Sequence, residues 1–280
     1  MTKFEFDYRM HEPKAPLGRL VESVWYARGT VPYARERIAP TGSTVAVFVL
    51  GDPIVETPAE GQPLRTDFGF LVGPHDRPVW NAPTGETYAM GIVTTPVGCE
   101  AVFGRLPSSL RGKVVPLADA WPASAEIRRE LLAAADSEDK LGRLVAHLEA
   151  IVVPNSTGFA RCEQAVALLG ADPKRPIAEI ADELQISHAH LDRQFTAWVG
   201  LGPRVLARLL RLRRMLERFD VQAPPDWAAL ASEYGWYDQA HFIRDFRRHT
   251  GVTPSEYVAA QRAAYAPESP GEGAGFVPDV

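Results

Sequence analysis

One pattern of side chains that can contact DNA occurs twice in the C-terminal third of the chain. The order Ala-His-x-x-Arg-x-Phe fills residues 189–195 and is repeated in residues 240–246. The arginine of each copy can donate two parallel hydrogen bonds to a guanine edge, the commonest specific contact made in the DNA major groove. A duplicated unit this short predicts repeated use of one docking element, of which the helix-turn-helix is the commonest.

Capping residues and apolar spacing predict a helix over each copy. Ser187 and Asp238 stand directly before the copies and can accept hydrogen bonds from the free N–H groups of a first helical turn. Leucine or phenylalanine then recurs at four-residue spacing, which gives each helix one buried face. A shorter apolar stretch precedes each copy, at residues 177–184 and 230–234, and supplies the other helix of each predicted pair.

The side chains expected to face DNA follow from this helical spacing. In the first unit they are His188, Ala189, Asp192, Arg193 and Thr196. In the second unit they are Gln239, Ala240, Ile243, Arg244 and Arg247. Gln239 can read adenine and Ala240 can touch a thymine methyl group. Contacts from the arginines to phosphate alone remain an open alternative.

An arginine-rich helix is predicted between the two units, over residues 205–219. Its arginines, with one residue before it, are Arg204, Arg208, Arg211, Arg213, Arg214 and Arg218. The formal net charge of −5 disfavours DNA binding mildly, but a local basic face matters more than the sum. Because Ala189 and Asp192 offer little to a guanine-rich edge, the second unit and this helix are expected to supply much of the nonspecific affinity.

Histidines and aromatic residues near the repeats have less specific interpretations. His190 and His241 occupy matched positions and are expected to pack at the helix starts or contact phosphate. No further His or Cys stands at zinc-like spacing, so no metal site is predicted there. Four aromatic residues are expected to lie in the core or between domains: Trp198, Trp227, Trp236 and Tyr237.

The first 120 residues are predicted to be rich in β-strands. Short apolar runs at residues 21–26, 44–50, 68–72 and 87–95 are separated by glycine and proline, which is typical of a sandwich or small barrel. Helical periodicity begins at Ser124 and continues to Ile151, and residues 154–158 form a turn-rich boundary. The predicted fold is therefore α+β with two domains, residues 1–153 and 154–262, followed by a disordered tail at 263–280.

Composition limits the class of protein. The two cysteines, Cys99 and Cys162, fall in different predicted domains and do not suggest a disulfide framework. The N-terminal residues have no apolar signal core, and the strongest apolar run, residues 45–50, is too short to span a bilayer. These features predict a cytoplasmic protein without a membrane partner.

The second unit resembles the signature of AraC/XylS-type transcription regulators. The resemblance rests on residues 235–248, on Thr250-Gly-Val-Thr-Pro254 and on Tyr257. Residues 180–195 resemble the first helix-turn-helix of that family, and the arginine-rich segment resembles its linker helix. The likeness covers about residues 159–262 and implies binding to double-stranded promoter DNA, with RNA polymerase and a second copy of the chain as further partners.

The N-terminal half is similar to an uncharacterised sensor type found in some members of that family. The similarity rests on residues 20–25, on Arg37 with Pro40, and on residues 72–78 and 96–98. It implies a cupin-like β-barrel that binds a small-molecule effector. Candidates to line the mouth of such a barrel are Trp25, Arg37, His75, Trp80 and Tyr88. No His-x-His pair marks a metal cupin, so neither a cofactor nor a catalytic residue is predicted.

Three functions are compatible with the sequence. The leading hypothesis is a DNA-binding transcription regulator that responds to a small organic ligand. The second is a ligand-independent regulator whose barrel serves only dimerisation or protein contacts. The third is an enzyme of alkyl-DNA repair, but that chemistry needs a reactive cysteine after proline and a cysteine-rich zinc site. Here the two cysteines follow Gly98 and Arg161.

Overall fold

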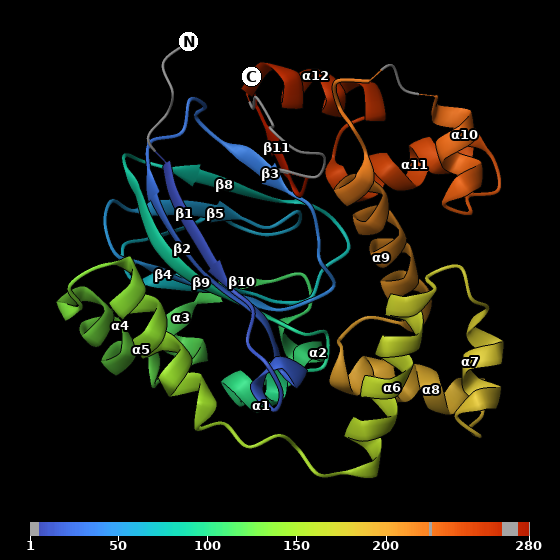
Figure 1. Ribbon diagram of the computed structural model, residues 1–280, viewed down its shortest axis with the longest axis horizontal. Coiled ribbons are helices and arrows are strands. Elements are labelled where there is room, and N and C mark those ends of the chain that lie inside the picture. The colour runs from blue at the N-terminus through green and yellow to red at the C-terminus, as the bar shows by residue number, and fades with distance from the viewer. Residues whose placement is uncertain (1–5, 224–225, 265–273, 280) are drawn as a thin grey trace.

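The N-terminal part of the chain folds into two antiparallel sheets in the computed structural model, which describes residues 6–223, 226–264 and 274–279 (Figure 1). The six-stranded sheet has the order β1 (Phe6–His11), β2 (Val21–Gly29), β9 (Thr87–Thr94), β4 (Val45–Val49), β7 (Gly69–Val72) and β10 (Val114–Pro116). The five-stranded sheet has the order β11 (Phe276–Pro278), β3 (Glu36–Ile38), β8 (Val79–Pro83), β5 (Ile54–Thr57) and β6 (Leu64–Thr66). The predicted β-rich domain is confirmed, but its strands form two separate sheets instead of one closed barrel.

Apolar alternation along the strands determines which residues lie between the sheets. Val47 and Val49 of β4 and Phe70 of β7 pack with Ile54 of β5 and Val79 of β8 in one buried cluster. Because successive strand residues point to opposite faces, the intervening residues of the six-stranded sheet point away from this cluster.

Helices cover the other face of the six-stranded sheet. They are the short helices α1 (Cys99–Phe103), α2 (Pro107–Leu110) and α3 (Leu117–Ala120), followed by α4 (Ser124–Ala133) and α5 (Ser137–Glu149). Met90 and Ile92 of β9 share a hydrophobic cluster with Leu117, Leu131 and Leu144 of these helices. The predicted helical pair after Ser124 is confirmed, and Asp136 caps α5 through the backbone N–H of Asp139.

The C-terminal half is helical and lies along one side of the sheets (Figure 1). Its helices are α6 (Thr157–Ala171), α7 (Ile177–Glu183), α8 (His188–Trp198), α9 (Pro203–Arg218), α10 (Trp227–Glu233), α11 (Gln239–Thr250) and α12 (Pro254–Ala264). The first unit, α6 to α8, shares a continuous hydrophobic cluster with the sheet domain, whereas the second unit packs in a cluster of its own. α9 runs from one unit to the other.

The prediction of a disordered tail at 263–280 is wrong for the part that the structure describes. α12 continues to Ala264, and residues 276–278 form β11, which pairs antiparallel with β3. Val277 is buried, and the Asp279 backbone N–H donates to the Arg35 carbonyl. A short apolar strand gains its order from the free edge of β3, a partner far away in sequence. Residues 265–273 and 280 lie outside the described residues.

Candidate nucleic-acid interface

α8 is held at its start by a side-chain cap and along its length by two buried residues. Ser187 Oγ accepts a hydrogen bond from the backbone N–H of His190 at 3.2 Å, and Leu191 and Phe195 are fully buried. This burial leaves three predicted DNA contacts exposed on the other side: Ala189, Arg193 and Thr196. The remaining two, His188 and Asp192, are partly buried, and His188 Nδ1 lies 3.2 Å from Asp192 Oδ2.

α11 repeats this construction. Asp238 Oδ1 accepts from the backbone N–H of His241 at 2.6 Å, and Phe242 and Phe246 face the core. Four predicted DNA contacts are exposed, namely Gln239, Ala240, Arg244 and Arg247, and Ile243 is partly buried. Within the described residues, no hydrogen bond or ion pair occupies the guanidinium group of Arg244 or Arg247. Both groups are therefore available to an anionic partner.

The aromatic and histidine expectations near the repeats have mixed outcomes. Trp236 is buried, and its indole Nε1 donates to Asp245 Oδ2 at 3.1 Å, so its predicted core position is confirmed. The prediction is wrong for Tyr237, a residue that is 92% exposed in the turn just before the Asp238 cap. His190 lies beside Arg161 and Arg193, with nitrogen atoms 3.4 Å apart in both contacts.

Arginines of α9 bind the two units to each other. Arg211 donates to the Gly235 carbonyl at 2.7 Å, in the turn of the second unit, and its guanidinium lies 5.5 Å from the centre of the Trp236 ring. Arg214 donates to the Gly170 and Ala171 carbonyls at the end of α6. These arginines satisfy carbonyl groups at helix ends and turns, and so join α9 to both units.

The expectation that the arginine-rich helix supplies much of the nonspecific DNA affinity is revised for three arginines of α9, because each has a partner within the chain. Arg211 and Arg214 bind carbonyls, and Arg213 forms ion pairs with Glu22 of the sheet domain and with Glu217 of α9. A run of arginines in sequence does not reveal these partners, since carbonyl groups at helix ends are placed only by the packing of the helices. Arg204 and Arg218 are exposed.

Replacing Arg211 by alanine is expected to destabilise the second unit, with loss of DNA affinity following from that. The change removes a charge-assisted hydrogen bond to a carbonyl and a contact with Trp236, worth roughly 1–3 kcal/mol together. Chemical denaturation of the full chain, followed by Trp fluorescence, measures this. Arg204→Ala serves as the matched control, because Arg204 is an exposed arginine of the same helix. Equal stability of the two variants would show that Arg211 has no structural role.

Equivalent glycines end both recognition helices against the sheet domain. Gly200 after α8 has φ of 77° and Gly251 after α11 has φ of 79°, which is the left-handed region that favours glycine. A Cβ at Gly200 would lie 3.0 Å from the Pro107 backbone, and a Cβ at Gly251 would lie 2.8 Å from Arg37 Cδ. Both helix-turn-helix units therefore contact the sheet domain directly.

Polar contacts strengthen the same boundary. The Arg248 guanidinium binds Asp76 Oδ2 at 2.6 Å, and His249 Nδ1 lies 2.7 Å from the Asp76 carbonyl oxygen. Burial lowers the pKa of His249, which favours its neutral form, whereas the Arg248 guanidinium lowers the pKa of Asp76 against the effect of burial. Arg19 binds Glu163 through two hydrogen bonds, of 2.7 and 2.6 Å.

The five predicted ligand-binding residues do not converge on one place in the described structure. Arg37 and Trp80 stack on each other at 3.9 Å, and their strand register places them on the face of the five-stranded sheet that points away from the other sheet. Tyr88 points to the helix-covered face of the six-stranded sheet, whereas Trp25 points to its inner face. His75 is buried in a loop, with Nδ1 2.8 Å from the Gly73 carbonyl oxygen.

A polar row that the sequence analysis missed lies on the inner face of the five-stranded sheet. Glu36, Asn81 and Glu56 are direct neighbours on β3, β8 and β5. Asn81 Nδ2 donates to Glu56 Oε2 at 2.9 Å, and the Tyr33 hydroxyl donates to Glu36 Oε2 at 2.7 Å. Burial raises the pKa of Glu56 to about 8, and the nearby Glu36 carboxylate adds to the shift. The sequence signal for this row is that Glu56 stands two residues after Ile54 in a short strand, so both side chains point to the same face.

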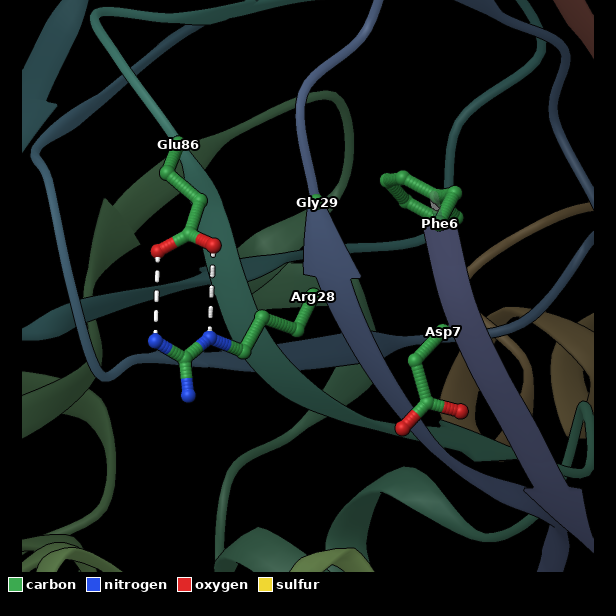
Figure 2. Close-up of a pocket in the computed structure, with 5 residues that line it drawn as sticks. All are labelled: Phe6, Asp7, Arg28, Gly29 and Glu86. Carbon is green, nitrogen blue, oxygen red and sulfur yellow. Dashed lines mark hydrogen bonds and ion pairs between the residues drawn. The ribbon is translucent and has the colours of Figure 1, made fainter. Parts of the chain in front are cut away.

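A hollow of about 440 Å³ lies at one end of β1 and β2 (Figure 2). It is lined by Phe6, Asp7, Arg28, Gly29 and Glu86, and none of these was predicted to bind a ligand. Arg28 and Glu86 lie next to each other in its lining and are joined by hydrogen bonds of 3.3 and 3.5 Å (Figure 2). The charged lining differs from the largely apolar lining of most small-molecule sites.

Neither cysteine suits nucleophilic chemistry. Burial raises the pKa of Cys99 to about 11 and that of Cys162 to about 12. The thiolate is the reactive form of cysteine, and at neutral pH both thiols remain protonated. The alkyl-DNA repair alternative thus loses its two candidate nucleophiles. In the part of the chain that the structure describes, no three His, Cys, Asp or Glu side chains gather as a metal site, and no helix is long and apolar enough to cross a membrane.

Structural comparison aligns this chain with solved structures at low sequence identity, each with a TM-score below 0.5. ToxT from Vibrio cholerae is 11% identical with a TM-score of 0.47, over 91% of this chain and 98% of that chain. Wild-type ToxT from V. cholerae strain SCE256, bound to an unsaturated fatty acid, is 12% identical with a TM-score of 0.45, over 92% and 95%. The AraC-like transcriptional activator CuxR is 14% identical with a TM-score of 0.28, over 68% and 79%.

Sequence comparison with protein families gives two matches. The family described as a helix-turn-helix domain matches residues 180–260, and a domain of unknown function, DUF6597, matches residues 9–116. A search of curated protein sequences gives no match to this chain. The first match covers both recognition helices and α9, and the second covers most of the two sheets. The chain therefore joins an AraC-type helix-turn-helix domain to an N-terminal domain of the DUF6597 family.

Proposed function

We propose that this protein is a sequence-specific DNA-binding transcription regulator whose sheet domain responds to a small molecule. The observation that carries the DNA-binding part is the pair of equivalent units. Each unit exposes one recognition-helix face, and α9 joins the two units through the Arg211 and Arg214 contacts. Two helices at a fixed spacing can enter successive stretches of the major groove.

The two recognition helices are suited to different tasks. α11 exposes Arg244, Arg247 and Gln239, which can hydrogen-bond to bases or phosphates. α8 exposes Arg193 and Thr196, but its Asp192 carboxylate faces His188 and repels phosphate. We therefore assign the tighter half-site to α11 and the weaker half-site to α8.

Selection of bound duplexes from a randomised DNA library tests this assignment on the full chain. The expected result is a two-part recognition sequence, with stronger base preference in the half that α11 contacts. Affinity for it should fall steeply with salt, because each phosphate contact releases counterions. Binding without sequence preference, or without salt dependence, would contradict the proposal.

The ligand part of the proposal is supported by the polar row between the sheets. A fully buried glutamate costs free energy unless its charge is neutralised or bonded, so such a group is often retained for recognition. On the inner face of the six-stranded sheet, Trp25 of β2 lies with its indole ring over Gly91 of β9. We propose that a small polar organic molecule binds between these faces and hydrogen-bonds to Glu56.

The contacts between the domains supply a route by which such a ligand could affect DNA binding. Asp76 holds Arg248 and His249, which belong to the last turn of α11. Gly251 lies against Arg37, whose strand also carries Glu36 of the polar row. A ligand that shifts β3 relative to β8 would therefore also move the contact between Arg37 and the end of α11. Coupling of this kind acts equally in both directions between DNA and ligand.

A thermal-shift screen of small polar organic compounds on the full chain tests the ligand part separately. A compound that binds the folded chain raises its Tm by mass action. A compound that binds at Glu56 is expected to raise the Tm of the wild type and of the control Glu60→Gln, but not that of Glu56→Gln. The same compound should change the affinity of the chain for the selected duplex. If every hit acts equally on both variants and leaves DNA binding unchanged, the sheet domain serves only assembly, and the ligand-independent reading holds.

A further inference from the structure

The edge strand β1 leaves one side of the six-stranded sheet open. β1 is the terminal strand and pairs with β2 alone, and all six of its residues are exposed. Across the described ranges 6–223, 226–264 and 274–279, no backbone–backbone hydrogen bond joins its outer edge to another segment. A free edge of this length is a template for another strand.

The same strand exposes a row of large apolar side chains. Phe6, Tyr8 and Met10 alternate along β1 and so share one face of the sheet, with 39%, 53% and 53% of each residue exposed. The Tyr8 ring stacks on Trp25 of β2, with ring centres 6.5 Å apart. Contiguous exposed apolar surface beside an open strand edge marks an interaction site more often than an isolated apolar residue does.

We propose that this edge pairs antiparallel with β1 of a second copy of the chain, centred on Tyr8. The sequence Phe6-Asp-Tyr-Arg-Met10 is complementary to itself when it is reversed about its central residue. Tyr8 then lies opposite the partner's Tyr8, and Phe6 lies opposite the partner's Met10. Asp7 lies opposite the partner's Arg9, so opposite charges meet twice across the junction.

Symmetry favours a second copy over an unrelated strand. An antiparallel pair has a twofold axis normal to the sheet, so the apolar row stays on one face of the joined sheets and the charged row stays on the other. Asp7 and Arg9 are bonded to each other at 3.1 Å within one chain and remain 47% and 55% exposed, so each can also reach a partner. An isologous twofold contact uses up both edges, which limits the assembly to a dimer.

Charge reversal tests the pairing and its register. Asp7→Arg and Arg9→Asp each place like charges opposite one another, and each should weaken the dimer at least about tenfold. The double variant with both changes should restore it. A mixture of the two single variants should form a mixed dimer, because every facing pair then has opposite charges. Sedimentation velocity on the full chain without DNA measures all four samples, against a chain mass of 30.7 kDa.

Arg129→Asp is the matched control, since Arg129 is an exposed arginine in a local ion pair with Glu126. Asp7 also lies opposite Arg28 of β2, so reversing the charge of Asp7 can destabilise the fold of a single chain. Thermal melting of each variant therefore checks that the chain is folded. Tyr8→Asp is a second disruptive variant, because it places two carboxylates at the twofold axis and leaves the pair of Asp7 and Arg28 unchanged. A wild-type chain that stays monomeric up to about 100 μM, single variants that dimerise like the wild type, or a mixture that stays monomeric would each overturn the proposal.

Discussion

Alanine at both Arg193 and Arg244 is expected to lower the affinity for the selected duplex by about 2–6 kcal/mol, which is roughly 30-fold to 10⁴-fold. Each arginine is exposed on its recognition helix and can make a bidentate contact with guanine. Arg244 is expected to contribute more, because its guanidinium has no partner within the described residues, whereas Arg193 lies 3.4 Å from His190 Nδ1. Fluorescence anisotropy with the selected duplex and with a scrambled duplex measures the loss.

The scrambled duplex separates base reading from phosphate contact. A base-reading arginine loses preference at one base pair when it is replaced, whereas a phosphate contact weakens all duplexes alike and lowers the salt slope by about one. Arg129→Ala is the control, since Arg129 is exposed in the sheet domain, far from both recognition helices in sequence. Equal losses on both duplexes would assign Arg193 and Arg244 to phosphate and leave the specificity to Gln239 and its neighbours.

The free energy of unfolding is expected to fall as pH rises from about 5 to about 8, and Glu56→Gln should remove much of this fall. The folded pKa of Glu56 is raised to about 8 from an ordinary value of 4.5. Between those values the folded chain holds a proton that the unfolded chain releases, so stability is highest below the lower pKa and is lost as pH approaches the higher one. One pKa unit corresponds to about 1.4 kcal/mol, so the loss amounts to several kcal/mol.

Comparison with a variant isolates this group from others that titrate in the same range. Burial lowers the pKa of His75 and His249, and their contribution has the opposite sign, since stability is lost as pH falls through their unfolded pKa. Glutamine keeps the size of Glu56 and an oxygen that can accept from Asn81. Denaturation curves at pH 5 to 9 for wild type, Glu56→Gln and Glu60→Gln give the differences. Parallel curves for wild type and Glu56→Gln would show that Glu56 is ionised in the folded chain.

Local features of the sequence were sufficient for the helical half. The caps Ser187 and Asp238 and the four-residue spacing of buried residues act within one helix, so they can be identified without knowledge of distant contacts. For the same reason the helix-turn-helix family could be named from its motif, and the family comparison confirms it.

The sheet domain was predictable only in part. Strand positions followed from apolar runs between turn residues, but the side of the sheet on which each residue lies depends on register and partner strands. Trp25 and Tyr88 thus point to opposite faces, and Arg37 and Trp80 point outward, although all four were predicted to line one barrel mouth. The assignment of individual residues to DNA contacts stays a prediction.

The sequence by itself therefore determined the two helix-turn-helix units and their family, because hydrogen bonding and burial within one helix follow a short period. Tertiary structure alone decided which partners the arginines of α9 bind, since those carbonyls come from α6 and from the turn before α11. It also decided that β11 completes a sheet begun at β3, and that Glu36, Asn81 and Glu56 form one row. These contacts join residues far apart in the chain, and their free energy depends on burial that no local pattern records.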